Sequence, residues 1–235
     1  VRNGKIKDCI NYANIISSHD LEGISYTGGI IGYAEAPEVL VINNCENYGN
    51  ITVSNETNGA VGGIAGGIFS SISQVSDCKN EGEISANSKY VGGIAGISHC
   101  EIKYSANKGK VTSLKNDAAG ICPKAFSEIS FSFNEGDVYA LNNAGGISVY
   151  GSCNVTYNTG KITGESSFAV TNSDSLKNSY TSSLIYTIPY FYYNLTQIKV
   201  NTKIQYCYIV ISQHISSSRG GGSQALSNAP TLLPS

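Results

Sequence analysis

The chain has 235 residues and a formal net charge of −2, and its 14% of charged residues is well below the ~25% of ordinary domains. This near-neutral balance gives no electrostatic basis for binding nucleic acid or an anionic membrane. No apolar run approaches the ~20 residues that span a bilayer, so we expect no membrane insertion.

A short motif, Asn-x-Gly, recurs along the chain. Its copies begin at Asn47, Asn80, Asn107, Asn134 and Asn158, after a weaker Asn-Tyr-Ala copy at Asn11. The step from Asn11 to Asn47 is 36 residues, and the step from Asn134 to Asn158 is 24 residues. Self-similarity on this scale indicates an array of stacked units, each packed on its neighbours.

A second motif lies between the copies of the first. Gly-Gly-Ile begins at Gly28, Gly62, Gly92 and Gly145, with Ala119-Gly120-Ile121 and, more loosely, Phe168-Ala169-Val170 in the same place. We expect the glycine pair to form a tight corner or to lie close to another backbone. The glycine of Asn-x-Gly suits a positive φ, and stacked asparagines suit a ladder of side-chain amides.

Aligning the units on both motifs produces four columns of like residues. The first apolar column is Ile6, Ile42, Val75, Ile102, Ile129, Cys153, Leu176 and Ile204. A column of small residues follows it at Cys9, Cys45, Cys78, Ser105, Ser132, Thr156, Ser179 and Cys207. The second apolar column is Ile15, Ile51, Ile84, Val111, Val138, Ile162 and Ile185. The third is Ile30, Ile64, Ile94, Ile121, Ile147 and Val170.

These columns predict the fold class. β-branched residues with polar neighbours, as in Gly82-Glu83-Ile84-Ser85, are typical of half-buried strands. Each unit has three such segments separated by turn residues, and a helical period of 3.6 is absent. We therefore predict an all-β chain that forms a right-handed parallel β-solenoid (β-helix) of about eight three-faced coils, stacked about 4.8 Å apart.

The two motifs together resemble a known repeat. Segments 90–96 (Tyr-Val-Gly-Gly-Ile-Ala-Gly) and 75–84 (Val-Ser-Asp-Cys-Lys-Asn-Glu-Gly-Glu-Ile) are similar to the GLUG motif, and the resemblance covers roughly residues 5–165. That motif is known from large bacterial surface proteins and from the region before the catalytic domain of IgA1-specific metallopeptidases. The resemblance implies a β-solenoid in a secreted or cell-surface protein. It implies no reaction, because the peptidase sequence His-Glu-x-x-His is absent here.

The repeat decays toward the C-terminal end. We expect a solenoid over residues 1–214 with irregular coils from about residue 165, and a flexible Ser/Gly-rich tail over 215–235. An aromatic run lies where the repeat decays, at Tyr186, Tyr190, Phe191, Tyr192 and Tyr193. Terminal repeats need a cap over their open strand edges, and exposed rings also suit binding, so both roles are open for this run.

Cysteine and histidine form no pattern of a catalytic or metal site. The column of Cys9, Cys45 and Cys78 continues as Ser and Thr, which indicates a small buried position. Disulfide formation and metal binding are the less favoured alternatives for it. His19 and His99 lack a partner at nucleophile or zinc spacing, and we interpret them as surface turn residues.

The acidic residues beside the turns alternate with lysines, which indicates solvated charge pairs rather than a catalytic carboxylate pair. These acidic residues are Asp77, Glu81, Glu83, Glu135 and Asp137. We therefore expect no catalytic, metal-binding or cofactor-binding residue, and no enzyme activity.

The expected function is that of a structural or adhesive spacer module in an extracellular or cell-surface protein. Its expected partners are host or matrix glycans, proteins, or further copies of the chain, and not nucleic acid. The alternative is a polysaccharide-binding or polysaccharide-cleaving β-helix protein. A clustered carboxylate groove on one outer face would distinguish the cleaving form.

Overall fold

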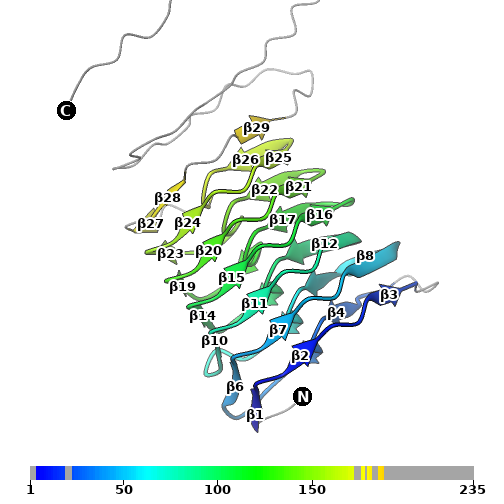
Figure 1. Ribbon diagram of the computed structural model, residues 1–235, viewed down its shortest axis with the longest axis vertical. Coiled ribbons are helices and arrows are strands. Elements are labelled where there is room, and N and C mark those ends of the chain that lie inside the picture. The colour runs from blue at the N-terminus through cyan, green and yellow to red at the C-terminus, as the bar shows by residue number, and fades with distance from the viewer. Residues whose placement is uncertain (1–3, 19–22, 172–175, 178, 182–184, 188–235) are drawn as a thin grey trace, which may run out of the picture.

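A computed structural model describes residues 4–18, 23–171, 176–177, 179–181 and 185–187 of the chain. They form strands β1 to β29, stacked in order from the N-terminal strands to β29 (Figure 1). Within these ranges there is no helix, and hence no helix of the length and apolarity that a membrane crossing requires. The predicted all-β class and parallel strand pairing are confirmed.

The strands form four parallel sheets, which we call A to D, and each sheet takes strands from successive repeat units. Sheet A contains β1 (Gly4–Lys7), β6 (Leu40–Asn43), β10 (Gln74–Ser76), β14 (Glu101–Lys103), β19 (Ile129–Ser130), β23 (Cys153–Asn154) and β27 (Leu176–Lys177). Sheet B contains β2 (Ile10–Asn11), β7 (Glu46–Asn47), β11 (Lys79–Asn80), β15 (Ala106–Asn107), β20 (Phe133–Asn134), β24 (Tyr157–Asn158) and β28 (Tyr180–Thr181).

Sheet C has two arms, joined because two long strands, β8 (Ile51–Gly62) and β12 (Ile84–Gly92), belong to both. Its first arm adds β3 (Ile15–Ser17), β16 (Val111–Ser113), β21 (Val138–Ala140), β25 (Ile162–Gly164) and β29 (Ile185–Thr187). Its second arm adds β4 (Tyr26–Gly28), β17 (Asp117–Ala119), β22 (Asn143–Gly145) and β26 (Ser166–Phe168). Sheet D contains β5 (Ile31–Ala34), β9 (Ala65–Ile68), β13 (Ala95–Ser98) and β18 (Lys124–Ala125).

The path of a unit differs from the three faces that we predicted. In the unit that begins with β14, the chain passes through sheet A, sheet B, the two arms of sheet C and then sheet D. The additional segments arise because the Gly-Gly motif folds the chain back on itself. A Cβ atom on Gly96 in β13 would lie 2.7 Å from the backbone nitrogen of Val61 in β8. The backbones of sheet D and of the second arm of sheet C therefore pack directly together.

The predicted columns have the expected register. Ile102 pairs with Val75 on one side and with Ile129 on the other, and all three are buried. In sheet C, Val111 pairs in the same way with Ile84 and Val138. The column of Ile64, Ile94 and Ile121 is fully buried, and the Ile94 backbone nitrogen donates to the Ile121 carbonyl oxygen at 3.0 Å. The apolar core of the described units is therefore a set of stacks of mainly Ile and Val side chains.

The asparagines of Asn-x-Gly form the amide ladder that the sequence predicts. Each Nδ2 donates to the Oδ1 of the asparagine in the next unit, from Asn11 to Asn158, at 2.6 to 2.8 Å. Each amide from Asn11 to Asn158 also donates to a carbonyl oxygen two residues later, as Asn107 does to Gly109 at 2.8 Å. The asparagines from Asn47 to Asn158 are fully buried, so the ladder is an internal feature.

The Gly-Gly motif faces this ladder. A Cβ atom on Gly63 would lie 2.5 Å from Asn80 Oδ1, and one on Gly93 would lie 2.4 Å from Asn107 Cγ. Real Cβ atoms do not approach other heavy atoms so closely, so a side chain at either position would collide with the ladder. The two motifs alternate in the sequence because they are in contact in the fold.

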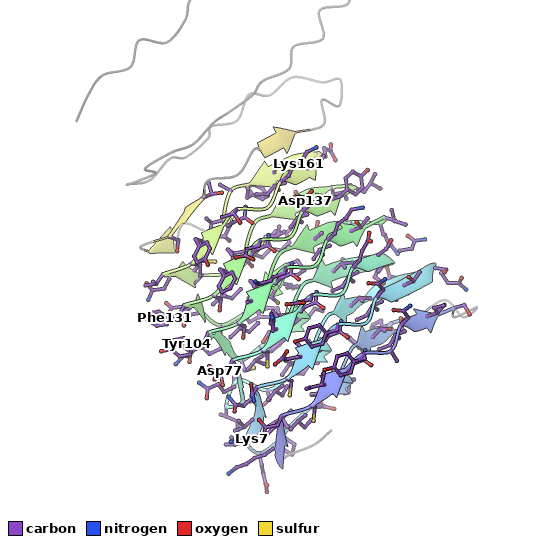
Figure 2. The ribbon with its side chains drawn as sticks, viewed as in Figure 1. Lys7, Asp77, Tyr104, Phe131, Asp137 and Lys161 are labelled. Atoms are coloured by element: carbon purple, nitrogen blue, oxygen red, sulfur yellow. The ribbon has the colours of Figure 1, made fainter. Side chains whose placement is uncertain are left out.

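The turn conformations differ from the expectation. The glycines of Asn-x-Gly do not have a positive φ, and of the described glycines only Gly4 does. Gly82 is required for space instead, since a Cβ atom there would lie 2.0 Å from the Gly49 carbonyl oxygen. The left-handed conformation occurs once per unit, one residue before the small-residue column, at Asp8, Asn44, Asp77, Tyr104, Phe131 and Val155. Figure 2 shows Asp77, Tyr104 and Phe131 one above another along this corner between sheets A and B.

We expect Ile94→Ala to lower the free energy of unfolding by about 2–5 kcal/mol, because it loses buried apolar surface and leaves a cavity in the stack. Chemical denaturation measures this loss. The matched control is Ile72→Ala, at a side chain that is 57% exposed, where the change should stay within about 0.5 kcal/mol. Equal losses at the two positions would show that the column is not a packed core.

We expect Asn107→Ala to lower the free energy of unfolding by about 2–6 kcal/mol, because one N–H of the buried Asn80 amide and the side-chain oxygen of Asn134 each lose their partner in the ladder, at ~1–3 kcal/mol each. The control is Asn58→Ala, at an exposed asparagine whose Oδ1 accepts from Lys115. A loss at Asn107 no greater than that at Asn58 in the same denaturation experiment would contradict a stabilising ladder.

Candidate functional site

The aromatic run named from the sequence lies almost entirely outside the described residues. Tyr186 lies in β29, where its backbone pairs with Thr163 of β25. Tyr190, Phe191, Tyr192 and Tyr193 fall beyond the described ranges, as do residues 215–235. The choice between a cap and a binding surface for this run therefore stays a prediction. Its one described backbone position, Tyr186, continues the register that joins Thr112, Tyr139 and Thr163 in the first arm of sheet C.

The row of Thr112, Tyr139 and Thr163 borders an open concavity of about 340 Å³ on the outer face of β16, β21 and β25. Strand alternation positions its lining. Val111, Val138 and Ile162 point into the core, so the residues on either side of each point outward. Those outward residues are Lys110 and Thr112, Asp137 and Tyr139, and Lys161 and Thr163. The register places Thr112, Tyr139 and Thr163 side by side across three strands.

Charges of opposite sign alternate along the edge of this concavity. Lys110 Nζ lies 3.3 Å from Glu83 Oε1, and the Lys161 backbone nitrogen donates to Asp137 Oδ1 at 2.9 Å. Figure 2 shows Asp137 and Lys161 at the same end of neighbouring strands. The lining therefore offers donors and acceptors without a strong net charge.

One hydroxyl in the lining has no hydrogen-bond partner. Thr112 is only 9% exposed, and its Oγ1 atom is buried without a partner among the described residues. Buried polar groups are normally hydrogen-bonded, and an unsatisfied one costs free energy. Thr112 also lines the concavity, and rotation about χ1 would turn its hydroxyl toward that space.

A second polar cluster, centred on Asp117, was not found by sequence reasoning. Asp117 in β17 is 1% exposed and accepts a hydrogen bond from Asn143 Nδ2 at 2.8 Å. Burial raises the pKa of this carboxyl, while hydrogen bonds from Asn143 and Tyr150 and the charge of Lys89 oppose the rise. Its partners are an amide and a phenol. The arrangement is therefore not the carboxyl pair that glycoside hydrolysis uses.

The signal for Asp117 was present but weak. Asp117 stands directly before the two small residues that precede Gly120-Ile121, in a row that also contains Tyr90 and Asn143. Residue type varies along this outward row while the inward columns repeat. A search for repeating residues therefore passes over a single buried carboxylate.

An outward aromatic row lies beside the Asp117 cluster. The rings of Tyr33, Phe69, His99 and Phe126 follow one another with centroids 4.3 to 5.3 Å apart. His99 lies in the bend after β13, in the kind of position that we expected, and its ring is half-buried between Phe69 and Phe126. Desolvation, with a smaller contribution from Lys124, lowers the pKa of His99. The ring therefore packs here as a largely neutral aromatic group.

The expected charge pairs occur in the structure, and Cys45 and Cys78 of the small-residue column are buried as expected. Glu81, Glu83 and Glu135 form ion pairs with Lys79, Lys110 and Lys108. The six cysteines of the described residues are free thiols, and burial raises the pKa of Cys153 to about 12. Among the described residues, no group of three or more His, Cys, Asp or Glu side chains could hold a metal ion.

Comparison with known proteins identified no relative of this chain. No protein-family model matches the chain, and no curated protein and no solved structure matches it.

We expect Asp117→Asn to stabilise the protein at neutral pH relative to the unchanged chain. Because the folded state raises the pKa of Asp117, the protonated carboxyl contributes stability at low pH, and this contribution is lost as the pH rises through the raised pKa. The advantage of the Asn variant should therefore shrink toward pH 3, below the ordinary pKa of ~3.9. Unfolding curves at a series of pH values measure it.

The control is Asp77→Asn, at an exposed carboxyl on the corner between sheets A and B. A difference between the Asp117 variant and the unchanged chain that does not vary with pH would contradict the raised pKa.

Proposed function

We propose that this chain is a right-handed parallel β-solenoid of about eight coils that serves as a non-catalytic spacer and adhesive module of an extracellular or cell-surface protein. The observation that carries the proposal is the unbroken amide ladder. Five buried or part-buried hydrogen bonds between asparagine side chains join six successive units. A stack held in register by its own interior suits a rigid support better than a hinged catalytic domain.

The finer features of this solenoid have separate support. Parallel strands joined by a crossover are right-handed in about 98% of cases, which favours the right-handed form. Sheet A already takes one strand from each of seven units. The eighth coil of the proposal is the segment around Ile204 and Cys207, which continues the sequence columns outside the described residues.

The extracellular setting rests on the resemblance to the GLUG motif. The contacts between the Asn-x-Gly ladder and the Gly-Gly corner explain why both motifs of that repeat are needed in this chain. The adhesive part of the proposal is supported by the concavity on sheet C, where polar side chains from three units converge.

We expect antibodies against the purified chain to label intact cells of the source organism or to detect the protein in its culture medium. We also expect the purified chain to turn over neither polysaccharides nor peptides. Detection in the cytoplasmic fraction alone would contradict the extracellular role. Reproducible cleavage that one Asp or Glu substitution abolishes, Asp117→Asn included, would contradict the non-catalytic role.

A further inference from the structure

We propose that the concavity on the first arm of sheet C is a binding site for a neutral saccharide, held by Thr112, Tyr139 and Thr163 and by the charged side chains around them. The inference deepens the adhesive part of the proposed function, on which it rests, by naming the chemical class of the partner. The volume of about 340 Å³ lies at the lower end of ordinary ligand sites, which span ~300–1,000 Å³.

The charge of the site selects the ligand class. Lys110 is paired with Glu83, and Lys161 stands beside Asp137, so the charges around the concavity balance. An anion would meet the carboxylates of Glu83 and Asp137 as well as the two lysines. A neutral ligand with many hydroxyl groups can instead donate to Asp137 and accept from the lysines, because each hydroxyl is both donor and acceptor.

The unsatisfied hydroxyl of Thr112 is the strongest sign that the site accepts a ligand. Of the buried side-chain oxygen and nitrogen atoms in the described part of the chain, four lack a partner, and Thr112 Oγ1 is the one that belongs to the lining. Rotation of the Thr112 side chain about χ1 would turn this hydroxyl toward a ligand hydroxyl in the concavity, which would satisfy it. Without ligand the unsatisfied hydroxyl costs free energy. Binding removes this cost, which adds to the binding free energy.

Tyr139 supplies the aromatic contact. Other outward rings pair with a ring in the next unit, as Tyr104 does with Phe131 at 5.1 Å and Phe133 with Tyr157 at 5.0 Å. Tyr139 stands between Thr112 and Thr163, and none of the ring pairs found among the described side chains includes it. Its half-buried ring therefore offers an amphipathic face to the C–H groups of a sugar.

The site also has a direction along the stack. The outward row that contains Tyr139 carries a hydroxyl residue in each of five successive strands: Thr52, Ser85, Thr112, Tyr139 and Thr163. A saccharide chain laid across the strands would meet a hydroxyl residue in each unit. We therefore expect an oligosaccharide to bind more tightly than a single sugar.

The test is titration of the full chain with defined saccharides, followed by calorimetry and by backbone amide NMR. The probes are the neutral hexasaccharides of glucose in α- and β-linkage, of galactose and of N-acetylglucosamine, and hexagalacturonate as the anionic arm. At least one neutral hexamer should bind and shift the amides of residues 110–112, 137–139 and 161–163.

Two variants and one control decide whether the site is the one described. Tyr139→Ala should weaken binding roughly tenfold, in line with an aromatic contact, and Thr112→Val should weaken it roughly fivefold, in line with one hydrogen bond. Because Thr112→Val removes an unsatisfied hydroxyl, its unfolding curve should show no loss of stability. Tyr12→Ala, at a ring that is 73% exposed and outside the row, should leave binding unchanged.

Three outcomes would overturn the proposal: no neutral hexamer binds at millimolar concentration, only the galacturonate binds, or binding is unaffected by both variants. Its failure is separable from failure of the proposed function, because antibody labelling of intact cells does not depend on sugar binding. Surface labelling without saccharide binding leaves the spacer role and removes the site. Saccharide binding by a chain found only in the cytoplasm leaves the site and removes the extracellular role.

Discussion

The buried asparagine ladder is the interaction on which the rest of this structure depends. Each amide makes bonds both within its unit and to the next, so all units must share one register. A shift of one residue would leave buried amides unsatisfied, at ~1–3 kcal/mol for each group. The space that the ladder occupies in turn requires the glycines at Gly63 and Gly93. The same register places the apolar side chains of successive units on one another, and their burial adds to stability.

Sequence reasoning predicted those features that are marked by the same kind of residue in successive units. The columns through Ile94 and Ile102 and the ladder through Asn107 were readable because the core accepts few residue types at those positions. The left-handed corner was not readable, because Asp77, Tyr104 and Val155 share a backbone conformation and no side-chain property. The sheet D strand of the first four units was missed for a related reason. Small residues such as Gly96 mark close backbone contact but do not show which strand is approached.

The candidate sites were harder to predict than the fold. Outward positions lie outside the repeating apolar core, so the stack tolerates Thr112 beside Tyr139 and Asp117 beside Asn143 without repeating either pair. Whether such residues form a site depends on register, burial and missing hydrogen-bond partners. These properties are known only once the units are stacked. The charge pairs were predictable because Glu83 and Lys110 already alternate in the aligned sequence.

The ladder also has a polarity. Every amide nitrogen from Asn11 to Asn134 donates toward the later unit, and every acceptor faces the earlier one. Each unit thus presents the same donor on one side and the same acceptor on the other. A gene duplication or deletion that adds or removes one whole unit would rejoin a donor to an acceptor and leave the interior unchanged. Loss of part of a unit would not, so evolution of such a chain can adjust its length in whole coils.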